Sequence, residues 1–132
     1  MDTEIQNVIK QLGIIVLSGD LDCPGRYVPD LNAIFIDEKL NEAQHRGVLV
    51  HELCHAAYQQ GESEIYHQTM VMQLKLEYEA NKFMISSLLN TYLKLTDEDP
   101  RDINYLEFMR QNYISSKNIG IVKEVISEYL AE

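Results

Sequence analysis

The segment His51-Glu52-Leu53-Cys54-His55 most constrains the fold, because it places two imidazoles and a carboxylate on one expected helical turn. Histidines four residues apart on a helix share a face, so both can point at one metal ion. The intervening glutamate can reach a water held by that ion and act as a general base. This pentapeptide pattern arises by chance in about one such sequence in a hundred, so its surroundings must support a metal site.

The surrounding residues predict a helix over about 41–60 that is packed on most sides. Asn41 is a suitable N-cap, and Gly61 is a suitable stop. The apolar residues between them that keep helical spacing are Val48, Leu49, Leu53, Ala56 and Ala57. Polar groups buried on such a helix need partners, which a metal and its water would provide. The alternative, two solvated histidines on a polar helix face, is disfavoured by this pattern.

A catalytic zinc needs a third protein ligand and an open position for water. The best candidate is Glu77, which stands four residues before Asn81 on a strongly helical segment. Glu77 can ligate the metal, and Asn81 can hydrogen-bond a ligand histidine and hold its ring in place. The stretch between His55 and Glu77 is long enough for a turn and a returning helix. The alternative for Glu77 is a solvated surface charge near Lys75 or Lys82.

The segments Leu49–Ala56 and Glu77–Leu89 together resemble the ImmA/IrrE metallopeptidases, whose pattern is H-E-L-x-H-A followed by E-x-E-A-N-x-F-A-x-x-L-L. The apolar segment Leu31–Asp37, which ends in an acid, also fits, and the resemblance covers roughly residues 10–90. It implies a gluzincin-like Zn²⁺ enzyme, typically encoded by phages, mobile elements or stress-response loci, that acts against a helix-turn-helix repressor. By position it implies His51, His55 and Glu77 as metal ligands, Glu52 as the catalytic acid/base, and Asn81 as the residue that holds a ligand histidine in place.

Two positions depart from the family pattern. Cys54 stands where such enzymes commonly have glycine, and Met84 stands where the family usually has alanine. Cysteine is small enough to let the motif helix lie close to a neighbouring strand. Met84 implies somewhat different packing behind the second helix. Neither change removes a ligand or the base, so the resemblance still implies metal binding.

Composition limits the class of protein. At 132 residues, with 45% hydrophobic and 24% charged residues, the chain suits one domain that buries a core without disulfides. No stretch approaches the ~18 apolar residues that span a membrane, and the acidic start lacks a leader pattern, so we expect a cytoplasmic protein. Cys23 and Cys54 are expected to be free thiols rather than a disulfide framework.

The net charge of −10 argues against direct nucleic-acid binding, because phosphate contacts need clustered Lys and Arg. The 11 basic residues are scattered along the chain, and no two are adjacent. An acidic surface suits a basic partner such as a DNA-binding repressor. We therefore expect a protein partner, and neither nucleic acid nor a membrane.

The order of apolar segments predicts an α+β fold with a small N-terminal mixed sheet, packed on an active-site helix pair, and C-terminal helices. We expect a helix over 3–12, strands near 14–17, 26–28 and 33–36, and helices over about 41–60 and 63–94. Ala33–Ile36 is the candidate edge strand for binding an extended substrate. The break at Thr96–Pro100 separates a metallopeptidase core, residues 1–96, from a C-terminal helical extension of the same domain, residues 97–132.

Three functions fit the sequence. The first is a zinc-dependent endopeptidase acting on a narrow intracellular protein substrate, a helix-turn-helix repressor. In it Glu52 would move protons, and the oxyanion would need a second donor from among Tyr58, Tyr66, His67, Tyr78 and Tyr92. The second is a non-proteolytic, metal-containing anti-repressor that works by binding its partner. The third is a DNA-binding regulator using the C-terminal helices, which the charge disfavours.

Overall fold

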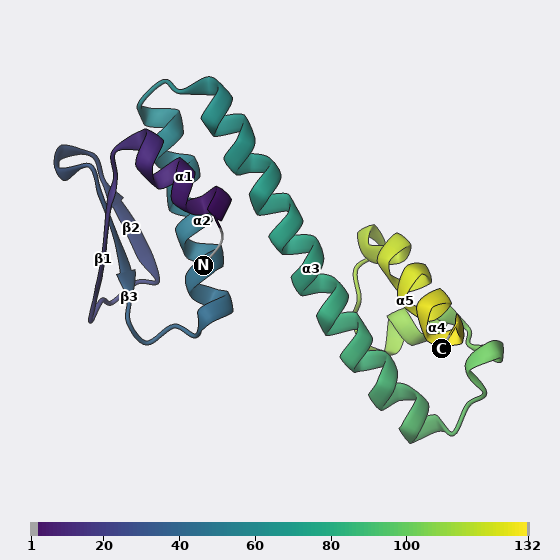
Figure 1. The fold of residues 1–132 in the computed structure, drawn as a ribbon. Coiled ribbons are helices and arrows are strands. Elements are labelled where there is room, and N and C mark those ends of the chain that lie inside the picture. Colours follow the sequence, from purple (N-terminus) through teal and green to yellow (C-terminus); the bar gives the residue numbers. More distant parts are fainter. Residues whose placement is uncertain (1–2, 132) are drawn as a thin grey trace. The chain divides into compact units, whose positions relative to one another are not determined.

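The computed structural model describes residues 3–131 and has the α+β fold that the sequence predicts, with a sheet near the N-terminus and helices after it (Figure 1). Its helices and strands are α1 (Thr3–Leu12), β1 (Ile15–Gly19), β2 (Gly25–Val28), β3 (Ala33–Asp37), α2 (Glu42–Gln59), α3 (Ser63–Thr96), α4 (Tyr105–Gln111) and α5 (Ile119–Ala131). The chain divides into two compact units, of which unit 1 ends at Leu76 and unit 2 begins at Glu77. Helix α3 therefore contributes residues to both units.

The sheet of unit 1 is mixed, as predicted, with the strand order β1-β3-β2. Strand β3 pairs in parallel with β1 and antiparallel with β2. The prediction that Ala33–Ile36 forms an edge strand is therefore wrong, because both sides of β3 are already paired. The edges of the sheet are β1 and β2.

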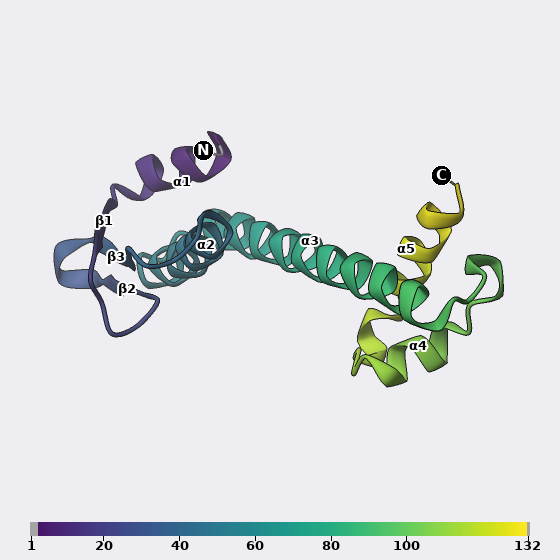
Figure 2. The same ribbon diagram turned by 90° about the horizontal axis from the view of Figure 1, so that it is seen from below.

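The core of unit 1 lies between the sheet and two helices, and α1 and α2 lie on the same side of the sheet (Figures 1 and 2). From β3, Ile34 and Ile36 are fully buried in this core. Helix α1 contributes Ile5 and Val8, and α2 contributes Leu53 among others. The alternation along β3 therefore directs one row of side chains into the core and anchors α2 over the sheet.

Helix α2 begins and ends where its sequence indicates. Asn41 forms a capping box with Gln44: the Asn41 side chain accepts from the Gln44 amide at 2.8 Å, and the Asn41 amide donates to the Gln44 side chain at 3.0 Å. At the other end Gly61 adopts a φ of 72°, a left-handed conformation that glycine adopts without steric cost. These two signals place the His51–His55 segment in the interior of a well-defined helix.

Unit 2 has a separate core. Phe108 is fully buried there, and its ring meets that of Tyr92 at a centroid distance of 5.2 Å. The buried residues of this core are Ile85, Leu89, Tyr92, Leu93, Phe108, Met109, Val122 and Val125. Since these come from α3, α4 and α5, the C-terminal helices pack into a cluster of their own.

A polar network joins α3 and α5 within unit 2. Tyr78 donates its hydroxyl to Glu124 at 2.7 Å, and Lys82 lies 3.1 Å from Glu124 and 2.8 Å from Glu128. The hydrogen bonds from Tyr78 and then Lys82 lower the pKa of Glu124, while Glu128 and then Glu124 raise the pKa of Lys82. These side chains therefore satisfy one another's hydrogen bonds.

Among the helices within residues 3–131, none is long and apolar enough to cross a membrane.

Candidate active site

His51 and His55 lie side by side on α2. Their Nε2 atoms are 3.1 Å apart, and their rings meet edge to face with centroids 4.7 Å apart. Two nitrogens at this distance either share a proton or face a common ion, depending on the tautomer of each ring. The four-residue spacing on a helix produces this convergence directly.

The histidines are exposed, which differs from the expectation that α2 is packed on most sides. The buried residues of α2 are Leu49, Val50, Leu53, Cys54, Ala56 and Ala57. They form one stripe that faces the core, and the motif histidines fall outside it. Burial therefore does not force these imidazoles to bind a metal, and the convergence of the two rings supports the site instead. Cys54, at the position where glycine is common, fits within the buried stripe.

The histidine pair fits a zinc ion. Zinc binds imidazole nitrogen at about 2.0–2.1 Å in tetrahedral geometry, which separates two such nitrogens by roughly 3.3 Å. The observed separation of the Nε2 atoms is 3.1 Å. No group of three or more His, Cys, Asp or Glu side chains within residues 3–131 is arranged to hold a metal. The structure thus brings together two of the predicted ligands, while Glu77 is exposed at the start of unit 2 and Asn81 follows one turn later on α3.

Glu52 lies beside the histidine pair and contacts the sheet. Its Oε2 accepts a hydrogen bond from the backbone amide of Tyr27 at 3.0 Å, and the side chain is half-buried. Tyr27 lies on β2, which has a neighbouring strand on one side only. A carboxylate held at an open strand edge, next to two metal-ligand side chains, is suitably placed to move protons at a bound peptide.

Gln73 is a site residue that the sequence reasoning missed. Its side-chain amide Nε2 lies 3.4 Å from Nδ1 of His51, on the side of the ring away from His55. After a 180° rotation of its amide, the same side chain would present its oxygen to an Nδ1–H of His51. A signal was available, because Gln73 stands four residues before Glu77 and helical spacing puts both on one face of α3.

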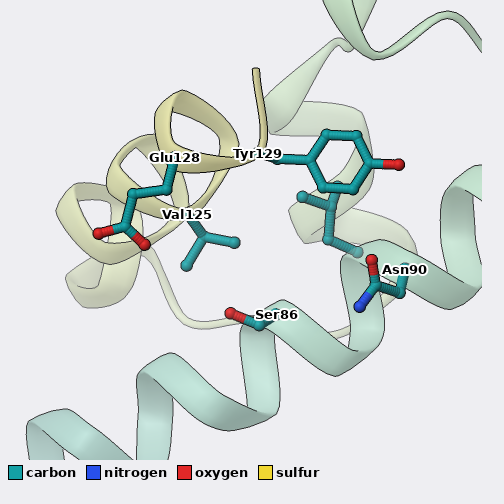
Figure 3. A pocket seen from close by; sticks show the side chains of 6 residues that line it. Ser86, Asn90, Val125, Glu128 and Tyr129 are labelled. Atoms are coloured by element: carbon teal, nitrogen blue, oxygen red, sulfur yellow. The ribbon is translucent and has the colours of Figure 1, made fainter. Parts of the chain in front are cut away.

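A pocket opens next to these residues in unit 1. It has a volume of about 410 Å³ and is lined by Pro24, Gly25, Gly47, Val48, His51, Glu52 and Gln73. A smaller pocket of about 150 Å³ lies in unit 2, where Ser86 and Asn90 project from α3 and Val125, Glu128 and Tyr129 from α5 (Figure 3). The unit 2 pocket contains no histidine or cysteine, and another pocket of unit 1 contains His45 but no residue of the His51–His55 motif. The pocket beside His51, Glu52 and Gln73 is therefore the candidate active site.

The proposed oxyanion donors have different surroundings. Tyr92 is buried in the core of unit 2, and the Tyr78 hydroxyl is bonded to Glu124, so neither is free to serve a substrate. Tyr58 is exposed and lies against Tyr66 in unit 1, with a centroid distance of 5.4 Å. His67 is exposed on α3. Tyr58, Tyr66 and His67 remain as candidates.

One comparison with known proteins gives a match. The model of the family Peptidase_M78, described as the IrrE N-terminal-like domain, matches residues 9–117. This range contains both the His51–His55 segment and the segment that carries Glu77. No curated protein and no solved structure gives a significant match.

Proposed function

Because the chain belongs to the Peptidase_M78 family of IrrE N-terminal-like domains, which indicates a metallopeptidase-type role, we propose that it is a zinc-dependent endopeptidase acting on a narrow intracellular protein substrate. The observation that carries this proposal is the distance of 3.1 Å between the Nε2 atoms of His51 and His55. The helical turn that bears these histidines also contains the half-buried Glu52. Two imidazoles and a carboxylate in this arrangement suit metal-assisted hydrolysis.

His51, His55 and Glu77 would hold the zinc, and Asn81 would support a ligand histidine. The support for Glu77 is its position in the second motif and its place on α3, one turn after the residue that contacts His51. When bound, zinc would supply a Lewis acid that polarises water and the scissile carbonyl. A carboxylate and two neutral imidazoles form the donor set that is typical of zinc peptidases.

Glu52 would move the protons of the reaction. Its carboxylate would take a proton from the attacking water and pass it to the leaving amine. The hydrogen bond from the Tyr27 amide holds one carboxylate oxygen at 3.0 Å and so orients the group. The free edge of β2, rather than β3, would bind the extended substrate by adding a strand, because β2 is the edge strand that contacts Glu52.

A DNA-binding repressor is the partner that we propose. The support is the resemblance of the two motifs to anti-repressor peptidases and the net charge of −10, which would attract the basic face of such a protein. Long-range attraction of this kind increases the rate of encounter and weakens with salt.

A second function is favoured by a specific contact. The hydrogen bond between Tyr27 and Glu52 ties β2 to α2, so Glu52 also has a structural part to play. The second function is that of a non-proteolytic, metal-containing anti-repressor that works by binding its partner. In such a protein Glu52 would have only this structural role. The two functions differ in whether the partner is cleaved.

The direct test is to load the protein with zinc, capture its partner from the source cells and map new peptide termini by mass spectrometry. We expect one zinc per chain and defined new termini in the partner, both lost in His55→Gln and kept in His45→Gln, which changes a histidine of α2 outside the motif. A partner that binds and is inactivated without any new terminus would favour the docking function. Zinc bound equally by wild type and His55→Gln would contradict the metal site.

A further inference from the structure

Gly47 stands in the interior of α2 without a packing reason. A Cβ atom built at this position meets no other heavy atom within 4 Å among the described residues. Glycine in a helix interior is destabilising relative to alanine, because it loses more conformational freedom on folding. The fold would therefore tolerate a side chain at position 47, and the absence of one requires a different explanation.

That explanation lies in the pocket of unit 1. Gly47 and Val48 precede His51 and Glu52 by four residues each, so they occupy the same two rows of α2, one turn earlier. One helical turn corresponds to about 5.4 Å along the axis, roughly the distance from a scissile carbonyl to the neighbouring side chain. A side chain at position 47 would project into the space beside the reactive residues.

The opposite wall of the pocket is also built for close approach. A Cβ atom on Gly25 would overlap Cγ1 of Val48 and would lie 3.2 Å from the carbonyl oxygen of Phe35. Glycine at the start of β2 therefore lets this strand come close to α2. With Pro24 before it, this wall consists of backbone and apolar atoms.

The chemistry of the lining selects the occupant. Apart from His51 and Glu52, the described residues that line the pocket are uncharged, and Gln73 is the polar one among them. An apolar side chain would gain from burial there, whereas a cationic one would meet only the Glu52 carboxylate, which the Tyr27 amide and the proposed proton transfer already engage. We propose that this pocket binds an apolar side chain of the substrate next to the scissile bond, and that Gly47 keeps it open. This inference rests on the proposed zinc peptidase.

The test uses three amino-acid hydroxamates that are acetylated on the α-amine and differ only in the side chain: acetyl-glycine, acetyl-leucine and acetyl-lysine hydroxamate, the last with a free, charged side chain. Their affinities are measured by calorimetry on the zinc-loaded full chain. We expect the leucine compound to bind about tenfold more tightly than the glycine compound, and the lysine compound to show no such gain. In Gly47→Leu the leucine preference falls to about twofold, since the new side chain fills the pocket, while the affinity for acetyl-glycine hydroxamate stays within twofold.

Thermal unfolding provides a readout without ligand. Gly47→Ala should raise the midpoint by roughly 2–5 °C, because alanine favours the helix and meets no neighbour. Gly120→Ala, in α5, is the matched control: its Cβ also meets nothing within 4 Å, and it should leave the hydroxamate preference unchanged. A lower midpoint in Gly47→Ala would show that the fold requires this glycine and would overturn the inference.

The failures of the two proposals are distinguishable. If acetyl-glycine hydroxamate does not bind the zinc-loaded protein, the metal site is wrong, and the substrate pocket falls with it. If that compound binds but the leucine preference is absent, or persists undiminished in Gly47→Leu, the zinc peptidase stands and the pocket assignment is wrong.

Discussion

Two polar clusters, one in each unit, differ in how their side chains are matched. In unit 2, Lys82 and Tyr78 are matched with the carboxylates of Glu124 and Glu128, so donors meet acceptors and α3 is tied to α5. In unit 1, His51 and His55 turn like groups toward each other at 3.1 Å. Matched partners stabilise a fold, whereas two convergent imidazoles would repel each other when protonated and suit a shared ion.

The glycines of unit 1 extend this contrast. Gly25 is required by the close approach of β2 to α2, while Gly47 sits where the fold would accept a side chain. The network of unit 2 uses long side chains to join α3 to α5. Unit 1 instead leaves space open beside its reactive residues, which is typical of a region selected for binding rather than for stability.

The largest expected effects test whether the two cores are separate. Phe108→Ala should cost about 3–5 kcal/mol of unfolding free energy, because it empties a fully buried site. Hydrogen exchange should then show lost protection in residues 77–131 and kept protection in β1–β3. Leu53→Ala, equally buried in unit 1, should give the converse pattern. Equal loss across the chain in both variants would show one cooperative domain, as the sequence predicts for residues 1–132.

The next effect sharpens the assignment of the third ligand. Glu77→Gln should weaken zinc binding by about 100-fold, because a neutral amide replaces a carboxylate ligand. Glu79→Gln is the matched control, since Glu79 is also an exposed glutamate on α3 and is expected to face solvent. Competition with a chelating dye measures both affinities. Equal affinities in the two variants would remove Glu77 from the ligand set.

A smaller change is expected at the residue that touches His51 from α3. Gln73→Ala should weaken zinc binding by about tenfold, because the amide that orients the ring through Nδ1 is lost. Gln68→Ala is the control, as Gln68 contacts Glu4 instead. Nitrogen NMR of the imidazoles should show a mixture of His51 tautomers in Gln73→Ala. Unchanged affinity and an unchanged tautomer would show that Gln73 only borders the pocket.

The smallest effect concerns the network of unit 2. The pKa of Glu124 is lowered by Tyr78 and Lys82, so its stabilisation is present above the usual carboxyl pKa and is lost as the pH falls through the lowered value. Between pH 6 and pH 3 the thermal midpoint should therefore fall further in wild type than in Lys82→Met. We expect the two decreases to differ by about 1–2 °C. The gap should shrink in high salt. Identical pH profiles would show that the network adds no stability.

Local signals in the sequence predicted the elements well. Asn41 and Gly61 gave the bounds of α2, and short apolar runs gave three strands within one or two residues. Strand pairing could not be predicted in the same way: the assignment of Ala33–Ile36 as an edge strand is wrong, because strand order depends on contacts between segments far apart in the sequence. The separation into two cores falls inside α3, where the helical pattern continues without a break.

The convergence of the two histidine side chains could be predicted from the sequence, whereas their surroundings could not. The spacing of His51 and His55 foretold that the two rings can converge, since this follows from helix geometry alone. Their exposure differs from the prediction, because the apolar residues of α2 form one stripe and do not surround the helix. The positions of Gln73 and Gly47 at the pocket could not be predicted, because they depend on contacts between segments far apart in the sequence.

The central claim, that the motif of α2 is a working peptidase site, is tested most directly by Glu52→Gln. Glutamine keeps an oxygen that can accept the Tyr27 amide, so the join between β2 and α2 should persist and one zinc per chain should remain bound. We predict that cleavage of the captured partner falls by about 10³-fold, measured as new termini over time on the zinc-loaded protein. Cleavage at the wild-type rate, with zinc bound, would contradict the account.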